Sequence, residues 1–254
     1  MNITILGTGT SSGVPVLTCK CDVCQSVNTK DARLRVSVLI QTEGLDIVID
    51  AGPDFRQQIL NTNIKKLDAL VFTHEHKDHT AGLDDVRPFN YIAGKKYLNI
   101  YARESVLTQL KREFHYAFQE QSYPGVPLIN TNVIENKSFS IEGLEIIPIE
   151  VLHHKLPVFG FRVKDFCYIT DANYISKIEL EKAKGAKVLV LDALQKTPHI
   201  SHYTLQQAIE VAKEIGAEKT YFTHISHKMG LHADVNKELP EGMQLAYDGL
   251  TFTL

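Results

Sequence analysis

Short apolar runs with the alternation typical of β-strands recur along the whole chain. They are rich in Val, Ile, Tyr and Phe, and Gly, Asp, Asn or Pro bounds most of them. The predicted strands are residues 3–6, 36–41, 46–49, 69–72, 98–101, 144–149, 159–163, 167–169, 188–191, 220–222 and 251–253. Cys167 begins one of these runs, so we expect it to be a buried thiol on a strand.

Three segments between the strands have the apolar spacing of amphipathic helices, at residues 104–118, 175–184 and 204–215. The last is the clearest. Its apolar face consists of Leu205, Ala208, Ile209 and Ala212. We expect Thr204 to cap its start and Gly216 to end it. Residues 119–131, which include two prolines and a glycine, are predicted to form a loop.

The order of these elements predicts the domain organisation. Strands dominate the first third of the chain, and strands alternate with helices in the last third. No repeat, low-complexity segment or Pro/Gly-rich linker divides the 254 residues. We therefore predict a single domain over residues 1–254, of the mixed α/β (or α+β) class, with two sheets and outer helices.

Composition narrows the class of protein. Hydrophobic residues make up 44% of the chain and charged residues 22%, which excludes a disordered chain. The formal charge is −3, so nucleic acid is not an expected partner. No apolar run is long enough to span a bilayer, and the first residues lack the features of a secretion signal. The sequence therefore predicts a cytoplasmic protein with no membrane contact.

Metal-binding side chains are concentrated directly after the predicted strand at 69–72. His74, His76, Asp78 and His79 fall within six residues. Imidazole and carboxylate together suit zinc, manganese or iron. Alternation at a strand end would point the first two the same way, and a helical turn after His76 would point the other two in a second direction. Two neighbouring directions are what two adjacent metal ions require.

The pattern His74-x-His76-x-Asp78-His79 resembles the H-x-H-x-D-H signature of the metallo-β-lactamase superfamily. Further family elements follow in order, and Asp50-Ala51-Gly52 resembles the family's Asp-x-Gly beside the metals. The resemblance implies that His74, His76 and His153 hold one ion, that Asp78, His79 and His224 hold the other, and that Asp171 bridges them. It also implies an αββα sandwich, with two mixed sheets flanked by helices and the metals at one edge between the sheets.

One ligand in this set has an alternative. His153 and His154 are adjacent, so either could bind the first ion. The spacing to Gly160 and the residues that follow the pair favour His153. His154 would then lie behind the ligand or in solvent.

Three of the four cysteines, Cys19, Cys21 and Cys24, fall within six positions. In a cytosolic chain such clustering favours metal binding over disulfides, and a closed zinc site needs a fourth ligand. The cluster, together with Thr-His-Ile-Ser-His at 223–227, resembles the subfamily of phosphoribosyl cyclic phosphodiesterases of the carbon–phosphorus lyase pathway. That resemblance implies a structural zinc held by the three cysteines and His227.

Asp78 and His202 are the residues that we expect to act in catalysis. In the cyclic phosphodiesterase relatives, a histidine at the place of His202 is implicated as the general acid. An alkoxide is a poor leaving group, so an acid is chemically required. His199 is a weaker candidate for substrate contact. His232 could contact substrate or support the zinc loop, and His115, in a predicted helix, is expected to be structural or solvated.

The resemblance implies a hydrolase with two divalent ions in the active site, zinc or manganese with iron as a third choice, besides the structural zinc. Such ions bridge a hydroxide and polarise a phosphoryl oxygen. The expected substrate is a small phosphodiester, in particular a five-membered cyclic phosphate. The alternatives are a nuclease of the tRNA 3′-processing type, a glyoxalase II-type thioesterase, and a non-catalytic metal sensor. The assembly is left open between a monomer and a homodimer.

Overall fold

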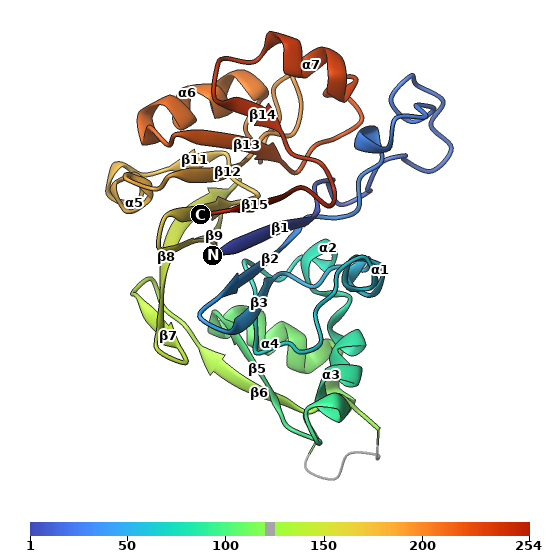
Figure 1. Cartoon of the computed structure of the whole chain (residues 1–254), viewed down its shortest axis with the longest axis vertical. Coiled ribbons are helices and arrows are strands. Elements are labelled where there is room, and N and C mark those ends of the chain that lie inside the picture. The colour runs from blue at the N-terminus through green and yellow to red at the C-terminus, as the bar shows by residue number, and fades with distance from the viewer. Residues whose placement is uncertain (120–124) are drawn as a thin grey trace.

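Two β-sheets lie face to face in the computed structural model, which describes residues 1–119 and 125–254 (Figure 1). The strand order of the first sheet is β15-β1-β2-β3-β4-β5-β6. Its strands are β1 (Asn2–Gly7), β2 (Ser37–Thr42), β3 (Leu45–Ile49), β4 (Ala69–Val71), β5 (Leu98–Ala102), β6 (Ile129–Val133) and β15 (Thr251–Thr253). The two chain ends lie side by side, and the Met1 amino group donates a 2.8 Å hydrogen bond to the Leu254 carbonyl.

The second sheet has the order β11-β8-β9-β10-β12-β13-β14, and β7 pairs with β8. Its strands are β7 (Phe139–Ile141), β8 (Leu144–His153), β9 (Leu156–Val163), β10 (Phe166–Ile169), β11 (Tyr174–Ile175), β12 (Val188–Asp192), β13 (Lys219–Thr223) and β14 (Met243–Leu245).

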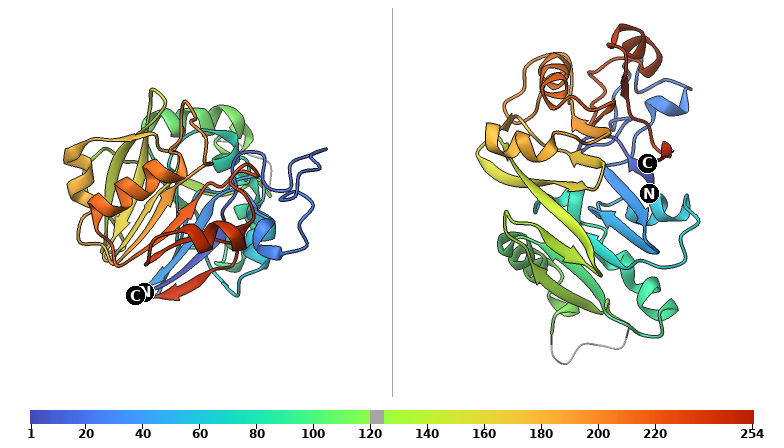
Figure 2. Two further views of the ribbon diagram at one scale, coloured as in Figure 1. Left: turned by 90° about the horizontal axis from the view of Figure 1, so that it is seen from above. Right: turned by 60° about the vertical axis from the view of Figure 1, so that its left-hand side comes forward.

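Helices cover the outer face of each sheet (Figure 2). The helices beside the first sheet are α1 (Phe55–Leu60), α2 (Lys77–Thr80), α3 (Arg87–Ile92) and α4 (Glu104–Glu113). Those on the second sheet are α5 (Lys177–Ala183), α6 (Leu205–Ile215) and α7 (His232–Glu238). Among the described residues, none of the helices has the length and apolar character needed to cross a membrane.

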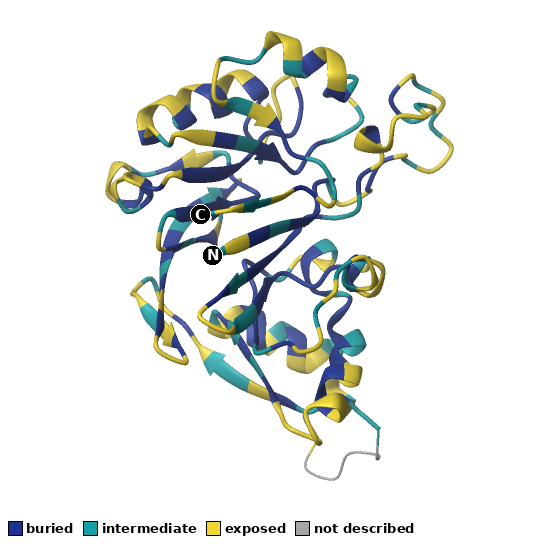
Figure 3. Cartoon of the chain, in the orientation of Figure 1, coloured by how far each residue is buried: buried dark blue, intermediate teal, exposed yellow. Residues whose placement is uncertain are grey.

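The side chains of β3 show how strand alternation builds the layers. Ile47 and Ile49 pack into the core between the two sheets, whereas Val48, which points the other way, packs against the helices of the first sheet. The central strands of each sheet are buried on both sides, whereas edge strands such as β6 and β15 are partly exposed, as Figure 3 shows. The predicted αββα layer order is confirmed.

Local signals for α6 are also confirmed. The Thr204 hydroxyl accepts a hydrogen bond from the Gln207 amide, and the Gln207 side-chain oxygen accepts one from the Thr204 amide, which makes a capping box. Gly216 ends the helix with a left-handed φ of 74°. Cys167 is fully buried on β10, as expected.

Two sequence predictions were wrong in part. The helix predicted over 104–118 ends at Glu113 and is followed by a short 3₁₀ turn at His115–Ala117. Within the predicted loop at 119–131, residues 129–131 belong to β6, which pairs in parallel with β5. Residues 120–124 lie outside the described part of the chain. The polar sequence of β6 gives no strand signal, and the segment is a strand because it pairs with β5.

Each sheet contains neighbouring strands that run parallel. β3 is parallel to β4, and β10 is parallel to β12, which is parallel to β13. Their carboxyl ends therefore lie together at one edge of the sandwich. Segments that follow such ends commonly build binding sites, because their side chains converge there.

Candidate metal centre

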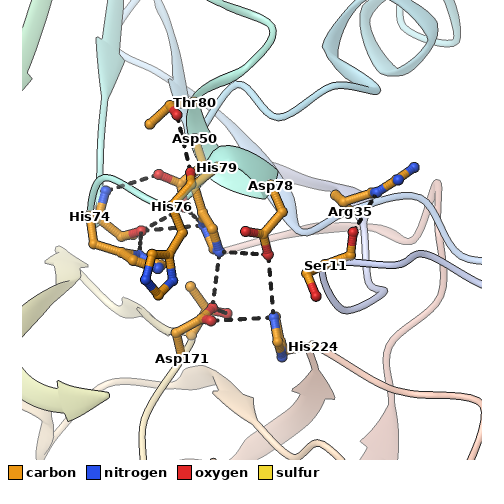
Figure 4. Close-up of polar contacts among 12 residues, drawn as sticks. Ser11, Arg35, Asp50, His74, His76, Asp78, His79, Thr80, Asp171 and His224 are labelled. Atoms are coloured by element: carbon orange, nitrogen blue, oxygen red, sulfur yellow. Dashed lines mark hydrogen bonds and ion pairs between the residues drawn. The ribbon is translucent and has the colours of Figure 1, made fainter. Parts of the chain in front are cut away.

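The residues of the predicted metal centre follow the carboxyl ends of strands in both sheets (Figure 4). Asp50 comes directly after β3, and His74 comes shortly after β4. From the second sheet, His153 ends β8, Asp171 follows β10, and His224 follows β13. The two sheets thus contribute to one site.

Asp50 fixes the orientation of His79. The Thr73 amide donates to Asp50 Oδ1 at 2.9 Å, and the Thr73 hydroxyl donates to Oδ2 at 2.8 Å. His79 Nδ1 donates to the same Oδ2 at 2.7 Å. This leaves His79 Nε2 to face the site, 3.3 Å from Asp171 Oδ2 and 3.4 Å from Asp78 Oδ2. Asp50 therefore lies behind a predicted ligand and orients it, the place that the family resemblance implies for this residue.

The predicted ligands fall into two groups, and within each group the nitrogen and oxygen atoms lie within 4.8 Å of one another. The first group is His74, His76 and His153, and the second is Asp78, His79, Asp171 and His224. His76 is extended, with φ −62° and ψ 147°, and α2 begins at the next residue. The helical turn predicted after His76 is therefore confirmed, and it separates the two directions.

Unpaired nitrogen atoms indicate what the site is built to hold. In the described structure, Nε2 of His74, His79 and His224 is buried and makes no hydrogen bond, although an Asp171 carboxylate oxygen lies 3.3 Å from each of the last two. Leaving such atoms unpaired costs about 1–3 kcal/mol each. All three lie among carboxylates and other imidazoles, which is the donor set that zinc, manganese and iron accept. The residues present fit divalent metal ions.

The pKa shifts of Asp78, Asp171 and His74 agree with this fit, whereas three carboxylates, against the effect of burial, raise the pKa of His79 well above its usual value. Burial works against the charged form of Asp78 and Asp171, but His79 and His224 hold the pKa of both carboxyls well below the usual value. Burial lowers the pKa of His74 well below its usual value, so its ring is neutral and can use a lone pair. The site thus combines ionised carboxylates with a neutral imidazole at neutral pH.

His153, and not His154, joins the ligand group. His153 Nδ1 donates to the Ser201 carbonyl at 3.0 Å, so its other nitrogen faces the neighbouring histidines. His154 lies in the turn between β8 and β9 with φ +57°, and its side chain is exposed. Its backbone amide donates to Asn173 Oδ1 at 2.7 Å.

The cysteine cluster meets His227 at a separate position. The sulfur atoms of Cys19, Cys21 and Cys24 lie 3.3, 3.4 and 3.6 Å from His227 Nδ1. A tetrahedral zinc ion separates its sulfur and nitrogen ligands by about 3.6 Å. The Cys24 amide and His227 lower the pKa of Cys21 to about 6, which favours a thiolate there, whereas burial raises the pKa of Cys24 to about 11. These four residues fit a zinc ion.

Of three further histidines, one lies in the site and two are exposed. His202 lies in the site, with its ring 4.6 Å from that of His153 and 4.5 Å from that of His224. His199 is exposed, with its ring 5.2 Å from that of His202. His115 is exposed on a 3₁₀ turn.

His232 could contact substrate or support the loop that carries the cysteine cluster, and its hydrogen bonds favour the second role. Its amide donates to Asp31 Oδ1 at 2.7 Å, and its Nδ1 accepts from Arg33 at 3.3 Å. Asp31 in turn accepts from Ser26, which follows the cysteine cluster.

One buried residue of the site was missed from the sequence. Asp192 ends β12 and contacts the rings of His202 and His224. The available signal was an acidic residue directly after the apolar run at 188–191, the same position relative to a predicted strand as Asp50.

A cavity of about 250 Å³ adjoins the metal centre at His202 and His224. Its polar lining includes Thr10, Ser11, Ser12, Gln195, His199, Ser226 and Lys228. Figure 4 shows Ser11 beside Asp78, and Arg35 Nε fixes this turn by donating to the Ser11 carbonyl at 3.0 Å. The cavity is of a size for a small polar molecule.

Comparison with known proteins identifies the family. The family model described as the β-lactamase superfamily domain matches residues 46–225, which is more than half of the chain. The chain belongs to the β-lactamase superfamily. The solved structure of a diphosphatase from the PhnP family matches it with a TM-score of 0.93 and 40% identity, over 99% of this chain and 96% of that chain. The predicted metallo-β-lactamase fold, and the resemblance on which it was based, are confirmed.

Two curated proteins that are similar in sequence are longer than the chain. An octanoyltransferase of Porphyromonas gingivalis is 38% identical over 253 residues, covering 98% of this chain but 51% of its own length. A ribonuclease Z of Prochlorococcus marinus is 28% identical over 205 residues, covering 76% of this chain and 61% of its own length. The chain therefore spans about half to three-fifths of these relatives. The short form of human tRNase Z shares the fold, with a TM-score of 0.71 and 20% identity.

Proposed function

We propose that this member of the superfamily is a metal-dependent phosphodiesterase that hydrolyses small phosphodiesters, with five-membered cyclic phosphates as the preferred class. The main support is one observation. Two groups of potential metal ligands lie side by side, and buried Nε2 atoms in them make no hydrogen bond. An open cavity of about 250 Å³ adjoins the second group at His224. Two of the similar proteins are named as a diphosphatase and a ribonuclease, and both activities cleave bonds to phosphorus.

We assign the proposed ligands to two ions as the family resemblance implies. His74, His76 and His153 would hold one ion, Asp78, His79 and His224 would hold the second, and Asp171 would lie between them. The mixed nitrogen and oxygen donors suit zinc or manganese, and also iron. When bound, two such ions supply a hydroxide nucleophile at neutral pH and stabilise the charge on a phosphoryl oxygen.

Asp78 has a second task in this proposal. Its Oδ2 lies 3.4 Å from His79 Nε2 and 3.9 Å from His224 Nε2. Its Oδ1 has no partner among the described residues, so it is available to accept a hydrogen bond from the attacking water. The lowered pKa keeps this carboxylate ionised at neutral pH and fit to accept.

His202 supplies the proton for the leaving group. Burial alone would lower the pKa of His202, but the Asp192 carboxylate against its Nδ1 raises that pKa above the usual value. A larger fraction of the ring is therefore protonated near neutral pH. The departing alkoxide takes this proton, a contribution typically worth about 10²–10⁴ in rate.

The proposed zinc at Cys19, Cys21, Cys24 and His227 has a structural role. It would tie the loop after β1 to the segment after β13, three residues beyond His224. The same loop supplies one wall of the cavity through Ser11 and Val16. Loss of this zinc would loosen both a ligand and the substrate wall.

A ribonuclease is the second candidate, because the ribonuclease Z relatives are 28% identical over much of the chain. The small cavity and the formal charge of −3 favour a small substrate over RNA. A precursor tRNA is therefore included among the substrates tested.

The test compares four substrates on the metal-reconstituted protein. They are bis(p-nitrophenyl) phosphate, glycerol 1,2-cyclic phosphate, S-lactoylglutathione and a precursor tRNA with a 3′ trailer. We expect turnover of the first two, loss of that turnover with a chelator or in Asp171→Ala, and full activity in the exposed control His115→Ala. Turnover of only the thioester or only the RNA would contradict the proposal. Metal binding without any turnover would instead support a sensor.

A further inference from the structure

Three consecutive residues with hydroxyl groups, Thr10, Ser11 and Ser12, line the cavity beside the metal centre. They belong to a turn after β1, in which the Gly13 amide donates to the Thr10 carbonyl at 2.8 Å. The same cavity reaches His202, the proposed acid. The leaving part of a substrate would take its proton there, so it would lie in the cavity that these hydroxyls line.

Arg35 fixes the position of Ser11 in this turn. Its Nε donates to the Ser11 carbonyl at 3.0 Å, so the carbonyl is used as an anchor. The guanidinium also lies close to Gly13, where an added Cβ would come within 3.5 Å of Arg35 Nη1. Figure 4 shows Ser11 between Arg35 and His224, with its carbonyl toward the arginine. The Ser11 hydroxyl is left for the cavity.

Asp54 and Gln58 in turn fix Arg35. Arg35 Nη1 lies 3.2 Å from both carboxylate oxygens of Asp54, and the Arg35 amide donates to Oδ2 at 2.8 Å. Gln58 Nε2 donates to the Arg35 carbonyl at 2.7 Å. Asp54 precedes α1, where an aspartate commonly caps the helix, but its side chain makes no capping hydrogen bond. This carboxylate is used to hold the arginine instead.

We propose that the Ser11 hydroxyl is a specificity-determining contact for a free hydroxyl on the leaving part of the substrate, and that Arg35 is the residue that positions it. The inference rests on the proposed phosphodiesterase function, in which that part of the substrate occupies the cavity. A serine hydroxyl can donate to or accept from such a group. Because the turn is already fixed, it loses little conformational freedom when the substrate binds.

The role assigned to Arg35 depends on the shape of its side chain as well as on its charge. Nε and Nη1 of the planar guanidinium reach the Ser11 carbonyl and Asp54 at the same time. The ammonium of a lysine is a single point charge and cannot reproduce this fork. Arg35→Lys therefore keeps a positive charge near the site but releases the turn. This variant separates positioning of Ser11 from simple attraction of an anionic substrate.

The test compares two substrates that differ by one hydroxyl, glycerol 1,2-cyclic phosphate and propane-1,2-diol cyclic phosphate. Both are monoanions, so attraction by charge cancels in the ratio of their kcat/KM values. We expect the wild type to prefer the glycerol compound about tenfold, the effect of one hydrogen bond. In Ser11→Ala and in Arg35→Lys this preference should fall below about threefold. The change should come from a higher KM for the glycerol compound, with kcat kept within about twofold.

The double variant should show the same ratio as Ser11→Ala, because Arg35 acts through Ser11. Ser138→Ala and Arg56→Lys are the matched controls, since both residues are exposed and neither lines the cavity. Both controls should keep the wild-type ratio. Elemental analysis should find the same metal content in all variants. Loss of an ion in Arg35→Lys would overturn the role of Arg35, because the arginine would then act through a metal site.

The remaining outcomes separate this inference from the proposed function. Turnover of both cyclic phosphates by the wild type without a preference would overturn the inference and leave the proposed function standing. A preference that survives in Ser11→Ala would also overturn it. A preference lost in Ser11→Ala but kept in Arg35→Lys would overturn the role of Arg35. No turnover of either compound by the wild type would overturn the proposed function, and the inference with it.

Asp54→Asn covers the case in which Arg35→Lys does not fold. The asparagine keeps the size of the side chain and an oxygen that can accept from the Arg35 amide, but it removes the ion pair with the guanidinium. We expect the same loss of preference for the glycerol compound. A wild-type ratio in Asp54→Asn would overturn the positioning of Ser11 through Arg35.

Discussion

His153 and His154 have the same side chain and adjacent positions, yet only one of them faces the site. His153 is the last residue of β8, and the Ser201 carbonyl fixes its Nδ1. His154 has left the strand with φ +57°, so its side chain points to solvent. The direction of the backbone at one residue decides which imidazole can be a ligand.

This pair provides a matched test at the residue scale. We expect His153→Ala to lower the active-site metal content and to reduce phosphodiesterase turnover at least 100-fold, because a ligand is removed. His154→Ala should keep both within twofold. Elemental analysis and an assay with bis(p-nitrophenyl) phosphate measure the two effects. The reverse pattern would assign the ligand to His154.

Residue spacing made most of the candidate ligands predictable, because His74, His76, Asp78 and His79 are close together in the sequence. Asp192 was not predictable in this way. Its partners lie 10 and 11 residues on in the chain, at His202 and Tyr203, after an irregular segment whose path the sequence does not define. Only the packed structure shows that the carboxylate lies beneath the ring.

Elements with local signals were predicted, and elements defined by their neighbours were missed. The ends of α6 follow from a capping box and a glycine, both of which act within one turn. By contrast, β6 is polar, and it is a strand because its backbone pairs in parallel with β5 at the edge of the sheet. Helix α7 was also missed, since it is short and its stability comes from the residues beneath it.

The end of α6 gives a prediction about stability alone. Gly216 has φ +74°, and a Cβ there would touch nothing within 4 Å, so an alanine would suffer only backbone strain. We expect Gly216→Ala to lower the free energy of unfolding by about 1 kcal/mol and to leave turnover unchanged. Glu214→Ala, an exposed change in the same turn, should stay within about 0.5 kcal/mol. Urea unfolding compares the two; equal effects would contradict the role of the glycine.

The start of α7 gives a prediction about pH. Burial and the nearby Arg33 lower the pKa of His232 to about 4. The folded protein therefore binds fewer protons than the unfolded chain between pH 6.5 and 4. The stabilisation that this neutral ring provides is complete above pH 6.5 and is lost as the pH falls toward 4.

His232→Asn keeps an acceptor toward Arg33 but does not titrate. On going from pH 7 to pH 5, we expect the wild type to lose up to about 2 kcal/mol more unfolding free energy than this variant. Urea unfolding at both pH values measures the difference. An equal loss in the two proteins would show that His232 does not titrate in this range.

At the scale of the whole molecule, parallel strands from both sheets end at one edge and bring together side chains from distant parts of the sequence. The cysteine cluster adds a link across 208 residues, from Cys19 to His227. The layer order and this site edge were predictable from the family resemblance. The cavity was not, because its walls come from the zinc loop, from the segment after β12 and from the segment after β13.

The most direct test of this account is the metal content per chain, measured by elemental analysis on the wild type and on a variant with Cys19, Cys21 and Cys24 all changed to serine. The account predicts about three ions in the wild type, with one zinc lost in the variant and two ions retained, because the proposed ligands would form a dinuclear centre and a separate site. A wild-type content near two that does not change in the variant would contradict the structural zinc. A content that falls to zero in the variant would contradict the independence of the two sites.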